Sequence, residues 1–364
     1  MKIKKIITIL EQWAPLSYAE EFDNVGLLVG NKNLDCTGLL ITIDTTEAII
    51  EEAIEKKCNL IVSFHPIIFS GLKKLTGKNY VEKIVVKAIE NKIAVYSIHT
   101  ALDNHKFGVS YKIGEKLGLL NQKILIPKNN TLKKLSVLTP ENKCEEILNA
   151  LYLIGAEEIG DYENCIFTIS GTGTFMGNNK SNSSFSLRHK KIIAPEKQIN
   201  MIFNNNIKNK IIKVLEELHP YDKIRYEIYS IDDINQDIGM GSIGELKNPL
   251  DSIKFMELVK YKMKTKLIKH SELLHKKVVK VAVLGGSGSF AIENAILENA
   301  DVYITSDLKY HDFFKTENKI ILMDIGHYES EQFTKNLIYE YLTKKLTNFA
   351  CILSQVQTNP IKYF

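Results

Sequence analysis

The chain has 364 residues, of which 45% are hydrophobic and 25% are charged, a composition typical of a globular protein with about two domains. Its 47 basic and 43 acidic residues leave a net charge of +4, so a nucleic-acid partner is possible but unsupported by composition. No apolar segment reaches the roughly 20 residues of a membrane span, and the N-terminal apolar run is too short for a signal peptide. The five scattered cysteines exclude a disulfide framework and indicate a reducing compartment, so we expect a cytoplasmic protein with no membrane contact.

Residues 1–130 alternate between helical and strand-like patterns. Apolar residues at helical spacing predict a helix over residues 3–13, and amphipathic patterns predict further helices at 46–57 and 80–91. Short apolar segments between them predict strands at 38–44, 59–63 and 92–98. Such alternation is typical of βαβ units on a mostly parallel sheet.

The middle of the chain, residues 131–246, has a different order of elements. Strand patterns surround two helical patterns at 142–154 and 208–218; the strands are expected at 135–139, 165–170, 185–195, 198–203 and 225–229. This order favours a ferredoxin-like α+β module. The α/β pattern resumes in residues 247–364, so we predict one α/β domain interrupted by an inserted α+β domain.

Polar side chains follow three of the predicted strands. His65 follows the strand at 59–63, His99 and Asp103 follow the strand at 92–98, and His327 follows a further predicted strand at 319–324. In open α/β sheets ligands bind beyond the carboxyl ends of the strands, so we expect these side chains to converge on one crevice. Glu331 lies four residues after His327 and would share one face of a helix with it. Imidazole and carboxylate groups suit Zn²⁺, Mn²⁺ or Fe²⁺, although a hydrogen-bonded histidine or a cap explains each residue taken alone.

A glycine-rich segment near the C-terminus permits another interpretation. Residues 286–291 match the pattern G-x-G-x-x-A, and Asp307 follows about 20 residues later, as in a dinucleotide fingerprint. A tight glycine turn between a strand and a helix explains the same residues and is the favoured reading. A dinucleotide-dependent oxidoreductase therefore stays only as a third hypothesis.

Longer stretches of the chain resemble a known family. The similar stretches, in order, are EFDNVGLLVG from Glu21, SFHPIIFSGLKKL from Ser63, SIHTALDNHKFGVS from Ser97, GGSGSF from Gly285, ADVYITSDLKYHD from Ala300 and DIGHYESE from Asp324. They resemble the GTP cyclohydrolase 1 type 2 homologue family, also called the NGG-interacting factor 3-like or NIF3-like family. In the middle, GTGTF from Gly171 and HPYD from His219 resemble the PII/CutA-like insert of longer members. The resemblance implies a NIF3-like α/β fold, layered with mostly parallel sheets and interrupted by that ferredoxin-like insert.

The resemblance also implies a pair of divalent metal ions, Zn, Mn or Fe, in each subunit. Carried over by position, the ligands are His65, Asp103, His327 and Glu331, with Glu331 bridging. Many members have a histidine where this chain has Phe64, so one metal loses a protein ligand, and a water or His99 would fill its place. The family further implies a toroidal homohexamer, built as two stacked trimers, with the metal sites facing an internal cavity.

Two functions remain open on this sequence. The first is a metal-dependent hydrolase of a nucleotide or phosphate-type substrate, in which two ions about 3.5–4 Å apart would activate water. His99 and His311 are its candidate catalytic residues, for proton transfer or substrate orientation, although buried hydrogen-bonded histidines would look the same. The alternative is a non-enzymatic metal-binding hexameric platform or regulatory protein, which needs no open coordination position.

Overall fold

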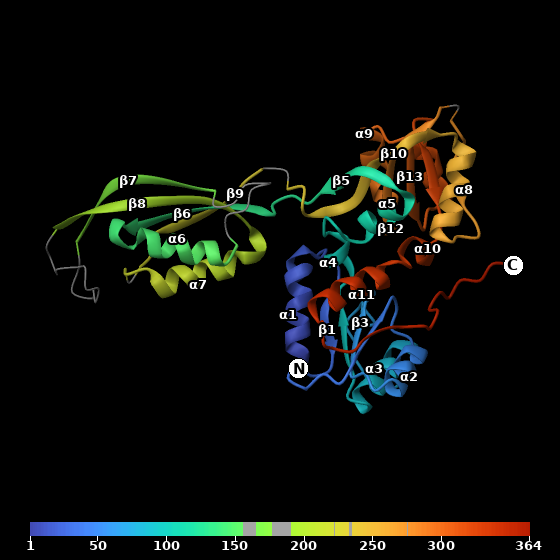
Figure 1. Cartoon of the computed structure of the whole chain (residues 1–364), viewed down its shortest axis with the longest axis horizontal. Coiled ribbons are helices and arrows are strands. Elements are labelled where there is room, and N and C mark those ends of the chain that lie inside the picture. Colours follow the sequence, from blue (N-terminus) through green and yellow to red (C-terminus); the bar gives the residue numbers. More distant parts are fainter. Residues whose placement is uncertain (156–164, 177–190, 222, 233–234, 275) are drawn as a thin grey trace. The chain divides into compact units, whose positions relative to one another are not determined.

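The computed structural model describes residues 1–155, 165–176, 191–221, 223–232, 235–274 and 276–364. These residues form two compact units, one made of Met1–Pro127 and Gln236–Phe364 and the other of Lys128–Asn235 (Figure 1). The second unit ends before residue 246, the boundary expected from the sequence. The reason is that β10 (Gly239–Leu250) pairs with β5 (Leu119–Pro127) and β12 (Val278–Ser287) in a sheet of the first unit.

The first unit contains a five-stranded sheet in the order β1-β4-β3-β2-β15. Its strands are β1 (Gly26–Val29), β2 (Leu39–Thr42), β3 (Leu60–Ser63), β4 (Ala94–Ser97) and β15 (Cys351–Leu353). All neighbours are parallel except β1 and β4. Successive residues of β2 belong to different apolar clusters, because side chains alternate between the two faces of a strand. Both faces are therefore buried, as the uninterrupted apolar sequence of these strands requires.

Helices cover both faces of this sheet (Figure 1). α1 (Ile3–Trp13) and α11 (Thr334–Lys345) pack on one face, and α2 (Glu47–Glu55) and α3 (Tyr80–Glu90) pack on the other. The helical spacing of apolar residues in α1 buries Ile3, Ile6 and Leu10 completely. The predicted helices and strands of this region are thus present.

The first unit also contains a six-stranded mixed sheet in the order β11-β14-β13-β12-β10-β5. Its remaining strands are β11 (Lys269–His270), β13 (Val302–Ser306) and β14 (Ile321–Asp324), and β12, β13 and β14 run parallel. Its helices are α4 (His99–Asp103), α5 (Val109–Leu117), α8 (Ser252–Met263), α9 (Ile292–Leu297) and α10 (His327–Glu331), of which α4 leads from β4 of the other sheet.

One apolar cluster joins the two sheets of this unit. It includes Val62 of β3 together with Val283, Ile304 and Met323 of β12, β13 and β14. Phe64, directly after β3, is completely buried in the same cluster. Because the sheets share this core, the carboxyl ends of β3 and β14 are held in a fixed relation.

The second unit is a four-stranded antiparallel sheet in the order β7-β8-β6-β9. Along the chain its elements are β6 (Leu132–Pro140), α6 (Cys144–Leu153), β7 (Ile166–Met176), β8 (Lys191–Asn204), α7 (Lys208–Leu218) and β9 (Tyr226–Ser230). The order βαββαβ is that of a ferredoxin-like module. Ile147, Leu151, Ile211 and Leu215 of its two helices are buried in one apolar cluster with the sheet.

No helix in the part of the chain that the structure describes is both long enough and apolar enough to cross a membrane.

Candidate metal centre

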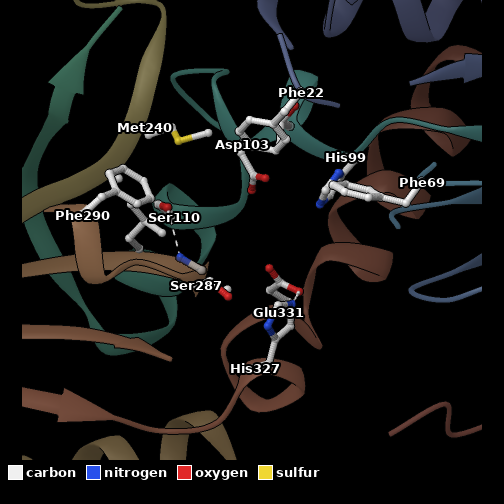
Figure 2. Close-up of a pocket in the computed structure, with 15 residues that line it drawn as sticks. Phe22, Phe69, His99, Asp103, Ser110, Met240, Ser287, Phe290, His327 and Glu331 are labelled. Carbon is white, nitrogen blue, oxygen red and sulfur yellow. Dashed lines mark hydrogen bonds and ion pairs between the residues drawn. The ribbon is translucent and has the colours of Figure 1, made fainter. Parts of the chain in front are cut away.

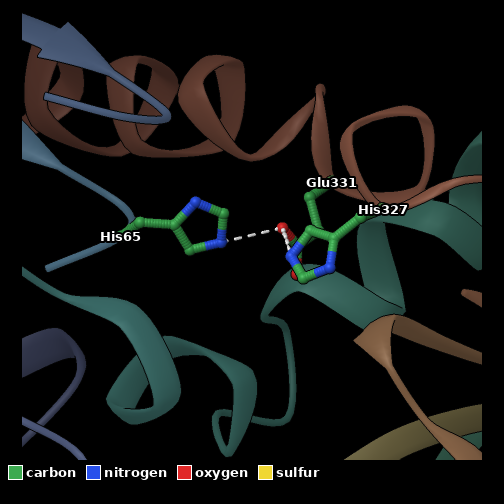
Figure 3. A group of neighbouring side chains, drawn as sticks. All are labelled: His65, His327 and Glu331. Atoms are coloured by element: carbon green, nitrogen blue, oxygen red, sulfur yellow. Dashed lines mark ion pairs between the residues drawn. The ribbon is translucent and has the colours of Figure 1, made fainter. Parts of the chain in front are cut away.

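Three of the predicted ligands form a compact group. One donor atom from each of His65, His327 and Glu331 lies within 4.8 Å of the others (Figure 3). His65 follows β3 after one residue, and α10 carries the other two side chains four residues apart on one face. The group therefore joins the strand end of one sheet to a helix that follows a strand of the other sheet.

Each histidine is oriented by a carboxylate at its Nδ1 atom. Nδ1 of His65 lies 2.7 Å from Oδ1 of Asp44, and Nδ1 of His327 lies 2.6 Å from Oδ2 of Asp307. Such a contact fixes the ring and directs Nε2 outward, as is usual for histidines that bind metals. Both Nε2 atoms converge on Oε2 of Glu331, at 3.0 Å from His65 and 3.1 Å from His327 (Figure 3).

The Glu331 carboxylate has the surroundings of a metal ligand. It is only 3% exposed, and among the described residues its Oε2 atom has no hydrogen bond of acceptable geometry, in spite of the two short ion-pair distances. A cation between the two imidazoles and this oxygen would satisfy it with better geometry. The donor set of two imidazole nitrogens and one carboxylate oxygen fits Zn²⁺, Mn²⁺ or Fe²⁺, so the residues present suit a divalent cation.

Gly286 gives the Glu331 carboxylate its space. This glycine has a φ angle of +71°, and a Cβ atom added to it would lie 2.4 Å from Oε1 of Glu331. Its amide also donates a 2.9 Å hydrogen bond to the hydroxyl of Ser330. A side chain at this position would therefore be strained and would displace Glu331.

The pKa values of the group reflect its mutual ion pairs. Burial by itself lowers the pKa of His65 and of His327, but the neighbouring carboxylates outweigh burial and raise these values to about 10 and about 11. Burial raises the pKa of Glu331, and the two imidazoles outweigh it and hold the value at about 2. A cation must therefore displace protons from the imidazoles, which makes its binding stronger at higher pH.

A cavity of about 310 Å³ opens beside the group (Figure 2). The Asp103 carboxylate points into it on the side opposite Glu331, and no hydrogen bond to this carboxylate is found among the described residues. Burial and the charge of Glu331 raise the pKa of Asp103 well above its usual range. Asp103 is thus near the compact group without belonging to it. Apolar side chains form much of the remaining wall, namely Phe22, Phe69, Met240, Leu284 and Phe290.

His99 also lines this cavity (Figure 2). Its Nδ1 atom lies 2.8 Å from Oδ1 of Asp23, and Thr100 donates two further hydrogen bonds to the same carboxylate. Burial raises the pKa of Asp23, but the hydrogen bonds from His99 and Thr100 outweigh it and lower the value to about 2. Asp23 is therefore a fixed anion that orients the His99 ring.

His311 does not join the other site residues. It lies in the 3₁₀ helix Tyr310–Thr316, is exposed, and is not among the residues that line the cavity. Its ring contacts those of Tyr310 and Phe314. This helix buries Asp312 and Thr316 and leaves His311 at the surface, so this chain's cavity receives no proton-transferring group from it.

The glycine-rich segment lies against the candidate metal centre and hydrogen-bonds to residues beside it. Asp307, the acid of the dinucleotide pattern, accepts hydrogen bonds from His327 and from the hydroxyl of Ser287. After Gly288 the chain forms a short 3₁₀ helix and then α9, which has only six residues. Such a short helix is a poor binding site for pyrophosphate, so the geometry does not favour the oxidoreductase hypothesis.

Sequence reasoning did not identify Asp44 and Asp307 as partners of the histidines. A signal for Asp44 was present, because it is the last residue of the predicted strand 38–44 and lies at the same sheet edge as His65. Phe64, the residue before His65, has a completely buried side chain whose ring centroid lies 5.4 Å from that of His99. It offers no ligand to the group.

The fold and the residue group define an α/β protein with a candidate metal centre that draws on two sheets. Residues 1–360 match the family model described as Duf34/NIF3 (NGG1p interacting factor 3), and the chain belongs to this family. It is 30% identical over 369 residues to a Bacillus subtilis protein named GTP cyclohydrolase 1 type 2 homolog, covering 99% of this chain and 98% of that one.

Solved structures agree with this assignment. The crystal structure of a Bacillus cereus protein related to NIF3 is similar with a TM-score of 0.85 and 33% identity, over 100% of this chain and 99% of that chain. A Staphylococcus aureus protein gives a TM-score of 0.78 and 27% identity over the same shares of the two chains. The expected NIF3-like α/β fold is confirmed.

Proposed function

We propose that this protein is a metal-dependent hydrolase of a nucleotide or phosphate-type substrate, with a dinuclear centre. The observation that carries the proposal is the position of Glu331, between two histidines that are each held by their own carboxylate, at the wall of a cavity. The three donor atoms lie within 4.8 Å of one another, which suits a divalent cation held between them, and the second ion of the proposal rests on the resemblance to the family. Relatives named GTP cyclohydrolase 1 type 2 homolog support a hydrolytic reaction on a nucleotide.

His65, His327 and Glu331 would hold the metal, and Asp103 would complete the set from across the cavity. Divalent ions there would polarise the bond to be attacked and lower the pKa of a water molecule. The mixed nitrogen and oxygen donors favour Zn²⁺, Mn²⁺ or Fe²⁺ over the harder Mg²⁺ and Ca²⁺.

The chain's own residues would move the proton and exclude water. Because Nδ1 of His99 is bound to Asp23, its Nε2 atom is left to exchange a proton with a substrate in the cavity. The apolar wall that contains Phe22 and Phe290 would displace water from a bound substrate, which strengthens every charged contact inside.

Metal analysis of tag-free protein by mass spectrometry tests the proposal. We expect close to two equivalents of metal per chain, a clear decrease in His327→Ala, and no change in His311→Ala, an exposed histidine outside the cavity. Metal-loaded wild-type protein should then hydrolyse at least one member of a panel of nucleotides and phosphate esters. Absence of metal after loading with Zn²⁺, Mn²⁺ and Fe²⁺ in turn, or absence of turnover by fully loaded protein, would contradict the proposal.

Phe64 favours one alternative, a metal-binding platform without catalysis. A buried phenylalanine cannot bind a metal, so the centre lacks the ligand that the resemblance to the family implies at this position. On this alternative, Glu331→Gln would weaken metal binding and leave the binding of a partner protein intact. One equivalent of metal without turnover would support it.

We further propose that the protein is a cytoplasmic homohexamer. The five free cysteines suit a reducing compartment, and the exposed aromatic residues Tyr310 and Phe314 suit contacts between copies. Light scattering should give six times the chain mass of 41.4 kDa. A monomer at micromolar concentration would contradict this assembly.

A further inference from the structure

A second cavity, of about 710 Å³, lies on the other side of His65. His65 and Asp44 line it, whereas the Nε2 atom of His65 is directed away from Asp44 towards Glu331. We infer that this second cavity binds the phosphate group of a small phosphorylated molecule. The inference goes beyond the proposed function, because the binding groups named below require no metal ion.

Two helices begin at this cavity. The N-cap residues Thr46 of α2 and Asn79 of α3 both line it, as do the first helical residues Glu47 and Tyr80. The side chains of Thr46 and Asn79 accept hydrogen bonds from the third amide of each helix, whereas the amides of Glu47 and Tyr80 have no hydrogen-bond partner among the described residues. Free amides and the positive end of the helix dipole favour an anion at each of these ends.

A buried hydroxyl independently points to a missing ligand. Thr45 lines the cavity and is only 5% exposed, and its Oγ1 atom has no hydrogen-bond partner in the part of the chain that the structure describes. Burying a hydroxyl without a partner costs free energy, and such groups are rare in folded proteins. A phosphate oxygen in the cavity would accept the hydrogen bond that Thr45 can donate.

The charges beside the cavity also favour an anion. Lys78 and Lys83 line it, are exposed, and form no ion pair with any described residue. The nearby carboxylate of Glu47 lies 3.2 Å from Lys87, which it shares with Glu51 at 2.7 Å. The ammonium groups are therefore available to a ligand, and the carboxylate is partly neutralised.

Asp44, the other acidic residue in the lining, has both of its oxygen atoms occupied. Oδ1 lies 2.7 Å from Nδ1 of His65, and Oδ2 accepts a 2.5 Å hydrogen bond from the hydroxyl of Thr358. An anion in the cavity would thus meet a carboxylate whose two oxygen atoms are already hydrogen-bonded.

The size of the cavity and the apolar part of its lining indicate a ligand larger than a free phosphate ion. Ile67, Tyr80 and Pro360 supply apolar surface beside the amides and lysines. A phosphate monoester with a ring or chain of carbon atoms would use both kinds of surface, because its phosphate would meet the helix ends and its carbon atoms would cover the apolar side chains.

Titration of metal-stripped full-length protein by calorimetry, in a buffer free of phosphate and of chelator, tests this inference. The probes are phenyl phosphate, inorganic phosphate, sulfate and phenol. We expect phenyl phosphate to bind most tightly, inorganic phosphate more weakly, and phenol not at all. Tighter binding of inorganic phosphate than of phenyl phosphate would overturn the assignment of a phosphate monoester as the ligand. Equal binding of sulfate and both phosphates would overturn the assignment of a phosphate-specific site. Absence of saturable binding of phenyl phosphate at millimolar concentration would overturn the whole inference.

Two variants and a matched control locate the binding. Lys83→Ala should weaken phenyl phosphate about tenfold, the usual loss for a charged hydrogen bond, whereas Lys74→Ala, in the loop before the same helix and outside the cavity, should leave it unchanged. Thr45→Val should weaken binding about fivefold and leave the melting temperature of the ligand-free protein unchanged or raised, because it removes an unpaired buried hydroxyl. Normal affinity in both variants, or a lower melting temperature of ligand-free Thr45→Val, would assign Thr45 and Lys83 a structural role and overturn the inference. Metal content and turnover do not enter this test, so its failure is distinguishable from failure of the proposed function.

Discussion

Substitution of Gly286 by alanine tests the geometry of the candidate metal centre most directly. The new Cβ atom would lie 2.4 Å from Oε1 of Glu331, so the carboxylate has to retreat by about 1 Å to reach ordinary van der Waals contact. Metal ligands tolerate displacements of only about 0.2 Å, so we expect metal affinity to fall by about 10–100-fold. The φ angle of +71° adds about 1–2 kcal/mol of backbone strain, which lowers stability without acting on the metal.

Gly118 provides the control that separates these two effects. It has a similar φ angle of +79°, and an added Cβ atom would meet no atom within 4 Å. Gly118→Ala should therefore cost about 1–2 kcal/mol of unfolding free energy in urea and leave zinc affinity unchanged. Zinc affinity is measured by competition with a chromophoric chelator. If Gly286→Ala binds zinc as tightly as Gly118→Ala, the contact between Gly286 and Glu331 does not define the site and the reasoning is refuted.

Three further predictions use these assays, and the second also uses calorimetry. Asp44→Asn and Asp307→Asn should each reduce zinc affinity at least tenfold, because each loses the carboxylate that orients a histidine; unchanged affinity in both would contradict the assigned contacts. With histidine pKa values raised to about 10 and about 11 and that of Glu331 held at about 2, the ion pairs stabilise the metal-free fold fully between about pH 4.5 and pH 6.5. This contribution is lost as the pH rises through about 10 and about 11, or as it falls towards 2. Zinc affinity should instead increase with pH, and calorimetry in two buffers of different ionisation heat should detect proton release; no release would contradict protonated imidazoles. Ile211→Ala, a completely buried change in the second unit, should cost about 2–5 kcal/mol of unfolding free energy and leave zinc affinity unchanged.

The helices and strands could be predicted because their apolar periodicity is local. The helix at residues 3–13 and the strand at 59–63 follow from residues that are neighbours in the sequence. The pairing of strands in the sheets could not be predicted, because β10 pairs with β5 and β12, which are distant in the chain. Strand pairing depends on which apolar faces find each other in three dimensions, so the sequence-based boundary at residue 246 could not anticipate that β10 belongs to the first unit.

The same distinction applies to the residues of the candidate site: those marked by local sequence patterns could be predicted, and those that depend on strand order could not. His65 and His327 were found because strand ends of α/β sheets gather at one edge, and Glu331 because four residues on a helix return to the same face. Asp44 and Asp307 each lie about 20 residues from the histidine that they orient. Their roles follow from the strand order, since β2 neighbours β3 and β13 neighbours β14. The sequence does not distinguish His311 from His99. They differ because the chain after β13 forms a 3₁₀ helix that leaves His311 at the surface.

The charges of the group indicate that one fold would accommodate both a metal-free state and a state with one divalent cation bound. Asp44, Glu331 and Asp307 carry three negative charges, which the protonated His65 and His327 reduce to one. Exchange of those two protons for one divalent cation leaves the same net charge on the same side chains. The buried carboxylate of Glu331 is therefore compensated in either state, and the core that joins the two sheets need not rearrange. A second cation would add two charges that this group cannot balance, so it would have to draw on the Asp103 carboxylate across the cavity.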